Sequence, residues 1–254
     1  LLALAAQGRD VDACRFLRLP VSWFACAASL ALHEAGAKMV VAHHVVNRCA
    51  ERFGVASDRP GVDRAIRAHV ALVLARVAVC GERPNALGPF AHVGINLLQH
   101  ERYGLAPGLC KMVGEAPRPP PRALRIKPAP PGDAGCYNAT LCVAALCSAN
   151  VAAAGPLLRK HGILKHLRAL ILEPRTGQPL LRQALLALRA VLRVPGSDAA
   201  RALAGSQKRG RSGKTLPERL EQLTMDAPLL DAQRGVARRV PIPHLSRDVL
   251  MALG

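Results

Sequence analysis

The stretch HGILKHLRALILEPRTGQPLLRQALLALRAVLRVPG, residues 161–196, holds two apolar helical segments separated by a short polar break. In the second segment, leucines recur at steps of four, three and four from Leu181 to Leu192, which places them on one stripe of a helix. A second stripe carries Arg182, Arg189 and Arg193. A helical hairpin of this kind cannot bury its apolar face alone, so the stretch predicts a stack of helices with cations on the outside.

The same arrangement recurs along the chain. A small residue, a glycine and an amphipathic segment follow one another in HEAGAKMVVAHHVV from His33, NALGPFAHVGINLLQH from Asn85 and RKHGILKHLRALI from Arg159. A longer Ala/Leu-rich segment follows each of them, as VDRAIRAHVALVLARVAV from Val62, NATLCVAALCSANVAAA from Asn138 and PLLRQALLALRAVLR from Pro179. These pairs predict repeated units of two or three helices.

The spacing of matching positions gives the period of this repeat. Leu146 and Leu188 lie 42 residues apart, and Gly36 and Gly162 lie 126 apart, which is three such periods. Aromatic residues make up only 3% of the chain, while Ala and Leu are abundant, which favours helix over β-sheet. We therefore expect an all-α helical-repeat solenoid of roughly three units.

One run also resembles a known family. NATLCVAALCSANVAAAGPLLRKHGILKHLRALI, residues 138–171, resembles the armadillo-like succession of Ala/Leu helix, Asn-containing turn, glycine and groove-lining helix. The resemblance extends over 138–193, is weaker over 22–79 and is poor elsewhere. It implies an armadillo-like α-solenoid, a fold that commonly holds an acidic or extended peptide in its concave face. Members of that family use a ladder of Asn and Trp there, whereas this chain has one tryptophan, Trp23, and no regular Asn ladder.

Two segments interrupt the helical pattern. Residues 114–135, GEAPRPPPRALRIKPAPPGDAG, are rich in Pro and Arg, which excludes helix and predicts an extended insertion. Residues 205–215, GSQKRGRSGKT, form a basic tract, followed by one short helix, PERLEQLTM, and an extended RRVPIPHL. The expected organisation is helical repeats over 1–113, the insertion over 114–135, armadillo-like repeats over 136–204, and a basic linker and extension over 205–254.

The chain is strongly basic, with 35 Lys and Arg against 17 Asp and Glu and a formal net charge of +18. Residues 155–219 alone carry 14 basic and three acidic side chains, a net charge of +11. Solvated helix exteriors usually intersperse Glu among their cations, so this excess favours a polyanion partner; a merely soluble basic protein is the alternative. No Phe, Trp or Tyr follows Tyr137, which argues against base stacking and favours phosphate contacts to structured RNA.

The candidate RNA-binding residues are the basic side chains of these segments, because Arg and Lys are the residues that contact phosphate. In the helical repeats and the basic tract they are Arg159, Lys160, Lys165, Arg168, Arg182, Arg189, Arg193, Lys208, Arg209, Arg211 and Lys214. In the Pro/Arg-rich insertion they are Arg118, Arg122, Arg125 and Lys127.

No motif predicts catalysis, a metal or a cofactor. His43 and His44 are adjacent, so they point about 100 degrees apart on a helix, and no zinc-like Cys or carboxylate spacing lies nearby. Residues 210–215, GRSGKT, match only the end of a phosphate-binding loop, and no apolar strand precedes them. Acidic residues are dispersed and offer no pair for acid/base work. We expect no enzyme, no cofactor and no small-molecule substrate.

The positions of the cysteines indicate the redox environment in which the protein works. Cys26, Cys80, Cys142 and Cys147 lie in apolar helical patterns of a chain much longer than disulfide-stapled modules, which predicts reduced core residues and an intracellular setting. No apolar run is long enough for a transmembrane segment. The chain begins at Leu1 without Met, which leaves open whether a leader precedes it.

These features lead to a functional hypothesis and an alternative. The hypothesis is a non-catalytic scaffold subunit of a large ribonucleoprotein, most simply an organellar, mitochondrial ribosome, that contacts rRNA phosphates and neighbouring proteins. A cytoplasmic location stays open. The alternative is an armadillo-like adaptor that binds an acidic or extended protein partner without RNA.

Overall fold

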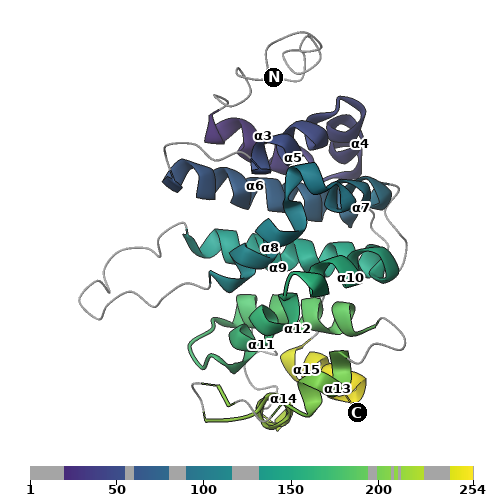
Figure 1. The fold of residues 1–254 in the computed structure, drawn as a ribbon. Coiled ribbons are helices and arrows are strands. Elements are labelled where there is room, and N and C mark those ends of the chain that lie inside the picture. Colours follow the sequence, from purple (N-terminus) through teal and green to yellow (C-terminus); the bar gives the residue numbers. More distant parts are fainter. Residues whose placement is uncertain are drawn as a thin grey trace, which may run out of the picture.

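The computed structural model describes residues 20–54, 60–79, 90–115, 132–193, 199–206, 209–210, 213–225 and 241–253. Within these ranges all regular secondary structure is helical and there is no strand, which confirms the all-α prediction (Figure 1). The helices are α3 (Val21–Leu30), α4 (Glu34–Ala42), α5 (Val45–Gly54), α6 (Pro60–Ala78), α7 (Ala91–Gln99), the short 3-10 helix η1 (Glu101–Tyr103), α8 (Leu105–Gly114), α9 (Gly132–Ala149), α10 (Val151–Lys160), α11 (Ile163–Leu172), α12 (Gln178–Leu192), α13 (Ala199–Ala204), α14 (Leu216–Met225) and α15 (Ile242–Leu253).

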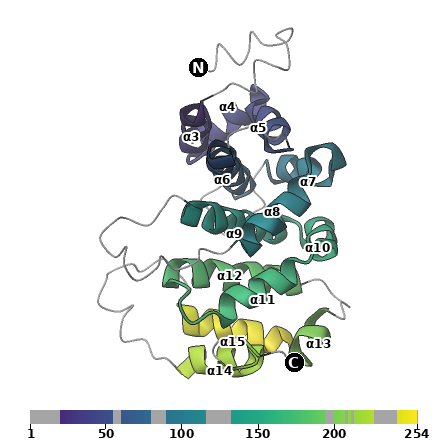
Figure 2. The ribbon, with the colours of Figure 1, turned by 60° about the vertical axis from the view of Figure 1, so that its left-hand side comes forward.

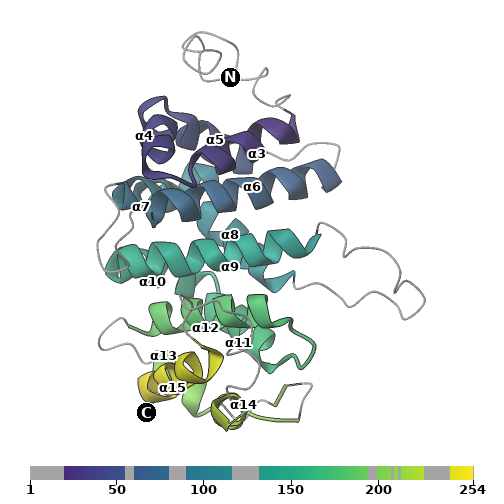
Figure 3. The same ribbon diagram turned by 180° about the vertical axis from the view of Figure 1, so that it is seen from behind.

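After α3 the helices follow a three-helix pattern. Two short helices precede a longer one in α4–α5–α6, α7–α8–α9, α10–α11–α12 and α13–α14–α15. The long helices pack in one row, α6 on α9, α9 on α12 and α12 on α15 (Figure 3), and the second helices α5, α8, α11 and α14 pack in another. The described residues therefore contain four stacked units, one more than the sequence predicts.

The fourth unit includes a helix that the sequence analysis describes as extended. Residues from Ile242 to Leu253 form α15, and the buried Leu245, Val249 and Leu253 pack it onto the stack. Pro241 and Pro243 flank the helix start, where a missing backbone N–H costs nothing. Similarly, α9 begins at Gly132, so the last four residues of the predicted extended insertion are helical.

The matching of Gly36 with Gly162 is also wrong. Gly162 has a left-handed backbone, with φ of 77°, and immediately precedes α11. The positions that do the same before α5 and α8 are His44, with φ of 55°, and Gly104, with φ of 57°. Gly36 instead lies inside α4. The sequence hides this equivalence because a histidine occupies a conformation that usually takes glycine.

One hydrophobic core runs through the whole stack, from Trp23 in α3 to Leu253 in α15. Cys142 and Cys147 are buried in it, as predicted, while Cys26 is half-buried and Cys80 lies outside the described residues. Burial raises the pKa of Cys147 to about 12, so that thiol stays protonated. In the described ranges no helix is long and apolar enough to cross a membrane.

Neighbouring units are also joined by specific contacts between their helices. The side chain of Asn138 in α9 donates a hydrogen bond of 3.0 Å to the backbone oxygen of Ala68 in α6. Gly108 in α8 lies directly against the ring of Phe53 in α5, where a larger residue would not fit. These contacts fix the register of the second unit on the first, so the exposed side chains of these two units have fixed relative positions.

Candidate polyanion-binding surface

Four exposed or half-exposed cations surround the joint between α10 and α11, and we name Arg159, Lys160, Lys165 and Arg193 the joint patch. Arg159 and Lys160 are in the last turn of α10. The chain then turns sharply, since the Gly162 N–H donates to the Arg159 carbonyl at 2.9 Å and the Lys165 N–H to the Gly162 carbonyl at 3.1 Å. Three of the four cations are therefore confined to one tight turn and the helix ends beside it.

Arg193 reaches the same end of the unit from another helix. It directly follows α12, and the short segment 173–177 joins α12 to α11, on which it packs. Two packed helices with so short a connection run antiparallel, so α12 ends on the side of the unit where α11 starts (Figure 1 and Figure 2). The charge of Arg159 opposes the burial-driven rise in the pKa of Cys147, near the end of α9.

Carboxylates are scarce in the stretch of sequence that carries the joint patch. From residue 134 to residue 197 the chain contains one acidic residue, Glu173, and eight basic ones. Within the described part of the chain, none of the four patch cations forms an ion pair with a carboxylate. Their positive charge is therefore available to a partner.

Other predicted cations have hydrogen-bond partners within the protein, either between the third and fourth units or inside the fourth. The Arg168 guanidinium in α11 donates to the Ser206 hydroxyl at 2.8 Å, and the Lys214 ammonium donates to the Gln222 side-chain oxygen at 2.9 Å. Arg219, which the sequence analysis leaves out of the candidate residues, donates to the Ile171 carbonyl near the end of α11 at 3.4 Å. Cations at a helix C-terminus interact favourably with its dipole, so this group has a structural role.

The start of α14 has an acidic partner of its own. The Thr215 backbone N–H donates to the Glu218 carboxylate at 2.7 Å, and this bond is the main cause that lowers the pKa of Glu218. Arg209 is exposed, and its charge and that of Lys214 favour the same carboxylate. The T-x-x-E pattern of residues 215–218 signals such a capping contact. The helix N-terminus next to the GRSGKT motif is thus capped by Glu218.

The three arginines on α12 and directly after it differ in their exposure and contacts. Arg189 pairs with Asp248 of α15 at 2.6 Å, with both side chains partly exposed. Arg182 is half-buried, whereas Arg193 is exposed. The remaining candidates, Arg118, Arg122, Arg125, Lys127, Lys208 and Arg211, lie outside the described residues.

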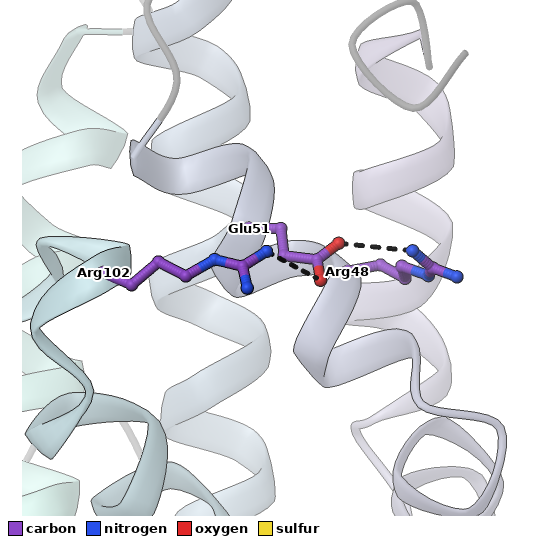
Figure 4. A network of polar contacts seen from close by, with 3 residues as sticks. All are labelled: Arg48, Glu51 and Arg102. Atoms are coloured by element: carbon purple, nitrogen blue, oxygen red, sulfur yellow. Dashed lines mark hydrogen bonds and ion pairs between the residues drawn. The ribbon is translucent and has the colours of Figure 1, made fainter. Parts of the chain in front are cut away.

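Three arginines of the first two units form ion pairs with carboxylates. Glu51 in α5 lies between Arg48, at 3.3 Å, and Arg102 of η1, at 3.9 Å (Figure 4). Arg52 and Asp63 form a buried ion pair at 2.7 Å that joins α5 to α6. These cations hold helices together, in contrast to the joint patch.

The long helices carry partly buried leucines that pack against the edge of the core. Half-buried Leu72, Leu141 and Leu186 lie on α6, α9 and α12. One turn earlier on two of these helices, the Gln183 amide in α12 donates to the Tyr137 hydroxyl in α9 at 3.4 Å. Trp23 is buried and packs edge-on against Phe24, so it offers no aromatic surface to a peptide.

The part of the chain that the structure describes contains no cluster of side chains that could bind a metal ion. Three or more His, Cys, Asp or Glu side chains do not come together there in a way that could hold a metal ion. His43 and His44 are both exposed at the end of α4.

No protein-family model matches the chain, and no curated protein matches it. Among solved structures, it is similar to an engineered protein of the Northeast Structural Genomics Consortium, with a TM-score of 0.52 and 12% identity over 99% of this chain and 95% of that one. It is also similar to a designed armadillo repeat protein in complex with the peptide (KR)4, with a TM-score of 0.49 and 12% identity over 100% and 99% of the two chains. The successive three-helix units, each ending in a long helix that packs on the next, give this chain the fold of an armadillo-like α-solenoid.

Proposed function

We propose that this chain is a non-catalytic binding scaffold whose C-terminal half contacts the phosphates of structured RNA. The observation that carries the proposal is the charge distribution from residue 134 to residue 197, where eight cations face one carboxylate. A folded surface with so few compensating acids attracts polyanions over a range of about 8–10 Å at physiological salt. The rigid stack of helices supplies a scaffold on which these cations keep fixed positions.

RNA phosphates suit this surface better than unpaired bases do. Single-strand readers stack bases on exposed aromatic side chains, and the chain has no Phe, Trp or Tyr after Tyr137. Recognition through phosphate and shape needs only cations at fixed positions. A subunit of a large ribonucleoprotein would use such contacts, and an organellar ribosome is the setting we propose. Neighbouring protein subunits would then contact the remaining surface.

Salt dependence tests this function. Binding of the full chain to an RNA duplex of about 16 base pairs is measured by fluorescence anisotropy at rising salt concentration. The logarithm of the association constant should fall linearly with the logarithm of salt concentration, with a slope of about −0.7 to −0.9 per phosphate contact. Salt-insensitive binding, or none, would refute the RNA proposal.

A parallel titration distinguishes RNA binding from the adaptor alternative, in which the partner is an acidic protein. Polyglutamate of matched total charge replaces the duplex and represents an acidic protein segment. If polyglutamate binds more tightly than RNA at the same salt concentration, the chain is better described as an adaptor for acidic proteins.

A further inference from the structure

We propose that the joint patch, rather than the cations of α12 or of the basic tract, is the surface that docks on the backbone of helical RNA. This inference rests on the proposed function and selects the contact surface within it. From the sequence alone, Arg168, Arg189 and Lys214 are candidate RNA-binding residues in the same way as the four patch residues. In the folded chain they make hydrogen bonds and an ion pair within the protein.

The first step of the argument is that three candidate cations already have structural partners. Arg189 is paired with Asp248, Arg168 with Ser206, and Lys214 with Gln222. To bind phosphate, Arg168 and Arg189 would have to give up contacts with the fourth unit, and Lys214 would have to give up a contact within it. A partner that used Arg168 or Arg189 would therefore loosen the attachment of α13–α15 to the stack.

The second step is the geometry of the joint patch. Arg159, Lys160 and Lys165 come from one sharp turn, and Arg193 comes from the helix end beside it. Lys160, Lys165 and Arg193 are exposed, and Arg159 is half-exposed. Because the three supporting helices, α10, α11 and α12, pack into the core, the cations are held in position before binding and lose little backbone freedom when they contact phosphate.

The third step concerns the kind of RNA. From Asn150 to Arg193, the described segment that carries the patch has no Phe, Trp or Tyr on which a base would stack. Helical RNA presents two phosphate rows at a fixed spacing and needs no stacking platform. The patch therefore fits the backbone of a duplex better than a flexible single strand.

The test compares two full-length variants that lose the same number of charges. The patch variant carries Arg159→Gln, Lys160→Gln, Lys165→Gln and Arg193→Gln. The control variant carries Lys38→Gln, Arg64→Gln, Lys111→Gln and Arg247→Gln, all exposed cations on other helices. Binding to the same RNA duplex is measured from low to high salt, and circular dichroism with urea unfolding checks the fold of both variants.

The patch variant should lose at least about tenfold in affinity at 0.1 M salt, and its salt slope should become less steep by about 3–4. The control should change much less on both measures. Equal losses of RNA affinity in the two variants would overturn the assignment of the contact surface to the joint patch, but not the proposal that the chain binds RNA. Absence of binding by the unaltered chain would instead overturn the proposed function, and the patch with it.

A second experiment maps the RNA contact on the unaltered chain by chemical footprinting. It still tests the inference if the patch variant does not fold. Lysine acetylation is measured by mass spectrometry with and without the duplex. Lys160 and Lys165 should be protected, while Lys38 and Lys111 should not. Equal protection of all four lysines would contradict the inference, and a single-stranded RNA that protects as well as the duplex would contradict its choice of partner.

Discussion

The first two units and the third unit differ in how their arginines meet carboxylates. In the first two, Glu51 pairs with Arg48 and Arg102, and Asp63 pairs with the buried Arg52. In the third, no described carboxylate pairs with any residue of the joint patch. A basic composition alone therefore does not identify a binding surface, because the same residue type stabilises one part of the stack and stays available on another.

The largest expected effect is on the buried pair of the first unit. Arg52→Met would leave the Asp63 carboxylate buried without its charged partner, so the free energy of unfolding should fall by about 3–5 kcal/mol. Urea unfolding followed by circular dichroism measures the loss. Arg102→Met, at an exposed position, is the control and should cost at most about 1 kcal/mol. Similar costs for both changes would show that the buried pair has no special structural role.

A second experiment gives the third unit the kind of acid that the first two contain. Ala169→Glu places a carboxylate on the exposed side of α11, one turn after Lys165. RNA affinity should fall several-fold although no cation has been removed. Ala169→Gln is the matched neutral control and should bind as the unaltered chain does. If both variants bind alike, the absence of carboxylates is not what makes the patch available.

The Arg189–Asp248 pair gives a smaller effect. Arg189→Gln should cost about 0.2–1 kcal/mol, because both side chains are partly exposed and water screens the attraction. A double-mutant cycle with Asp248→Asn isolates the interaction, and hydrogen exchange should show faster opening of α15. Although Arg189 lies one turn before Arg193, RNA affinity should fall less than it does when a single patch cation is replaced by Gln. A tenfold loss would place Arg189 in the binding surface and contradict our division of the cations.

The pH dependence of α14 is the smallest effect. The pKa of Glu218 is lowered mainly by its hydrogen bond from Thr215, so the folded state favours the ionised carboxylate. The resulting stabilisation is fully present above the ordinary pKa of about 4.5 and is lost as pH falls through the lower folded value. Hydrogen exchange in α14 should therefore accelerate in acid, and in Glu218→Gln it should be faster at neutral pH and nearly independent of pH. Acid-induced opening that persists in Glu218→Gln would assign the effect to another group.

The sequence predicted much of the fold because the relevant signals are local. Leucine spacing in residues 181–192 gave the buried stripe of α12, and the three Ala/Leu-rich segments are the long helices α6, α9 and α12 and the start of α10. The unit count was too low because α15 has two prolines at its start and lies beyond the basic tract. His44 concealed the equivalence of the first unit with the others, since its left-handed backbone gives no glycine signal.

The candidate site was predictable only as a charge excess. Asp248, the partner of Arg189, lies 59 residues away in sequence, and Ser206, the partner of Arg168, lies 38 away. No helical periodicity links positions so far apart, because each pair spans helices of different units. By contrast, the contact between Thr215 and Glu218 has a sequence signal that predicts it.

The sequence by itself determined the helical class, the apolar stripes that must be buried and the positive charge of the C-terminal half, since all three depend on residue type and short spacing. Tertiary structure decided which cations remain available. An ion pair forms only where packed helices bring a cation and a carboxylate within a few ångströms, and that proximity depends on the register of one unit on the next. The same arginine-rich composition thus gives a structural contact at Arg189 and an open surface at Arg193.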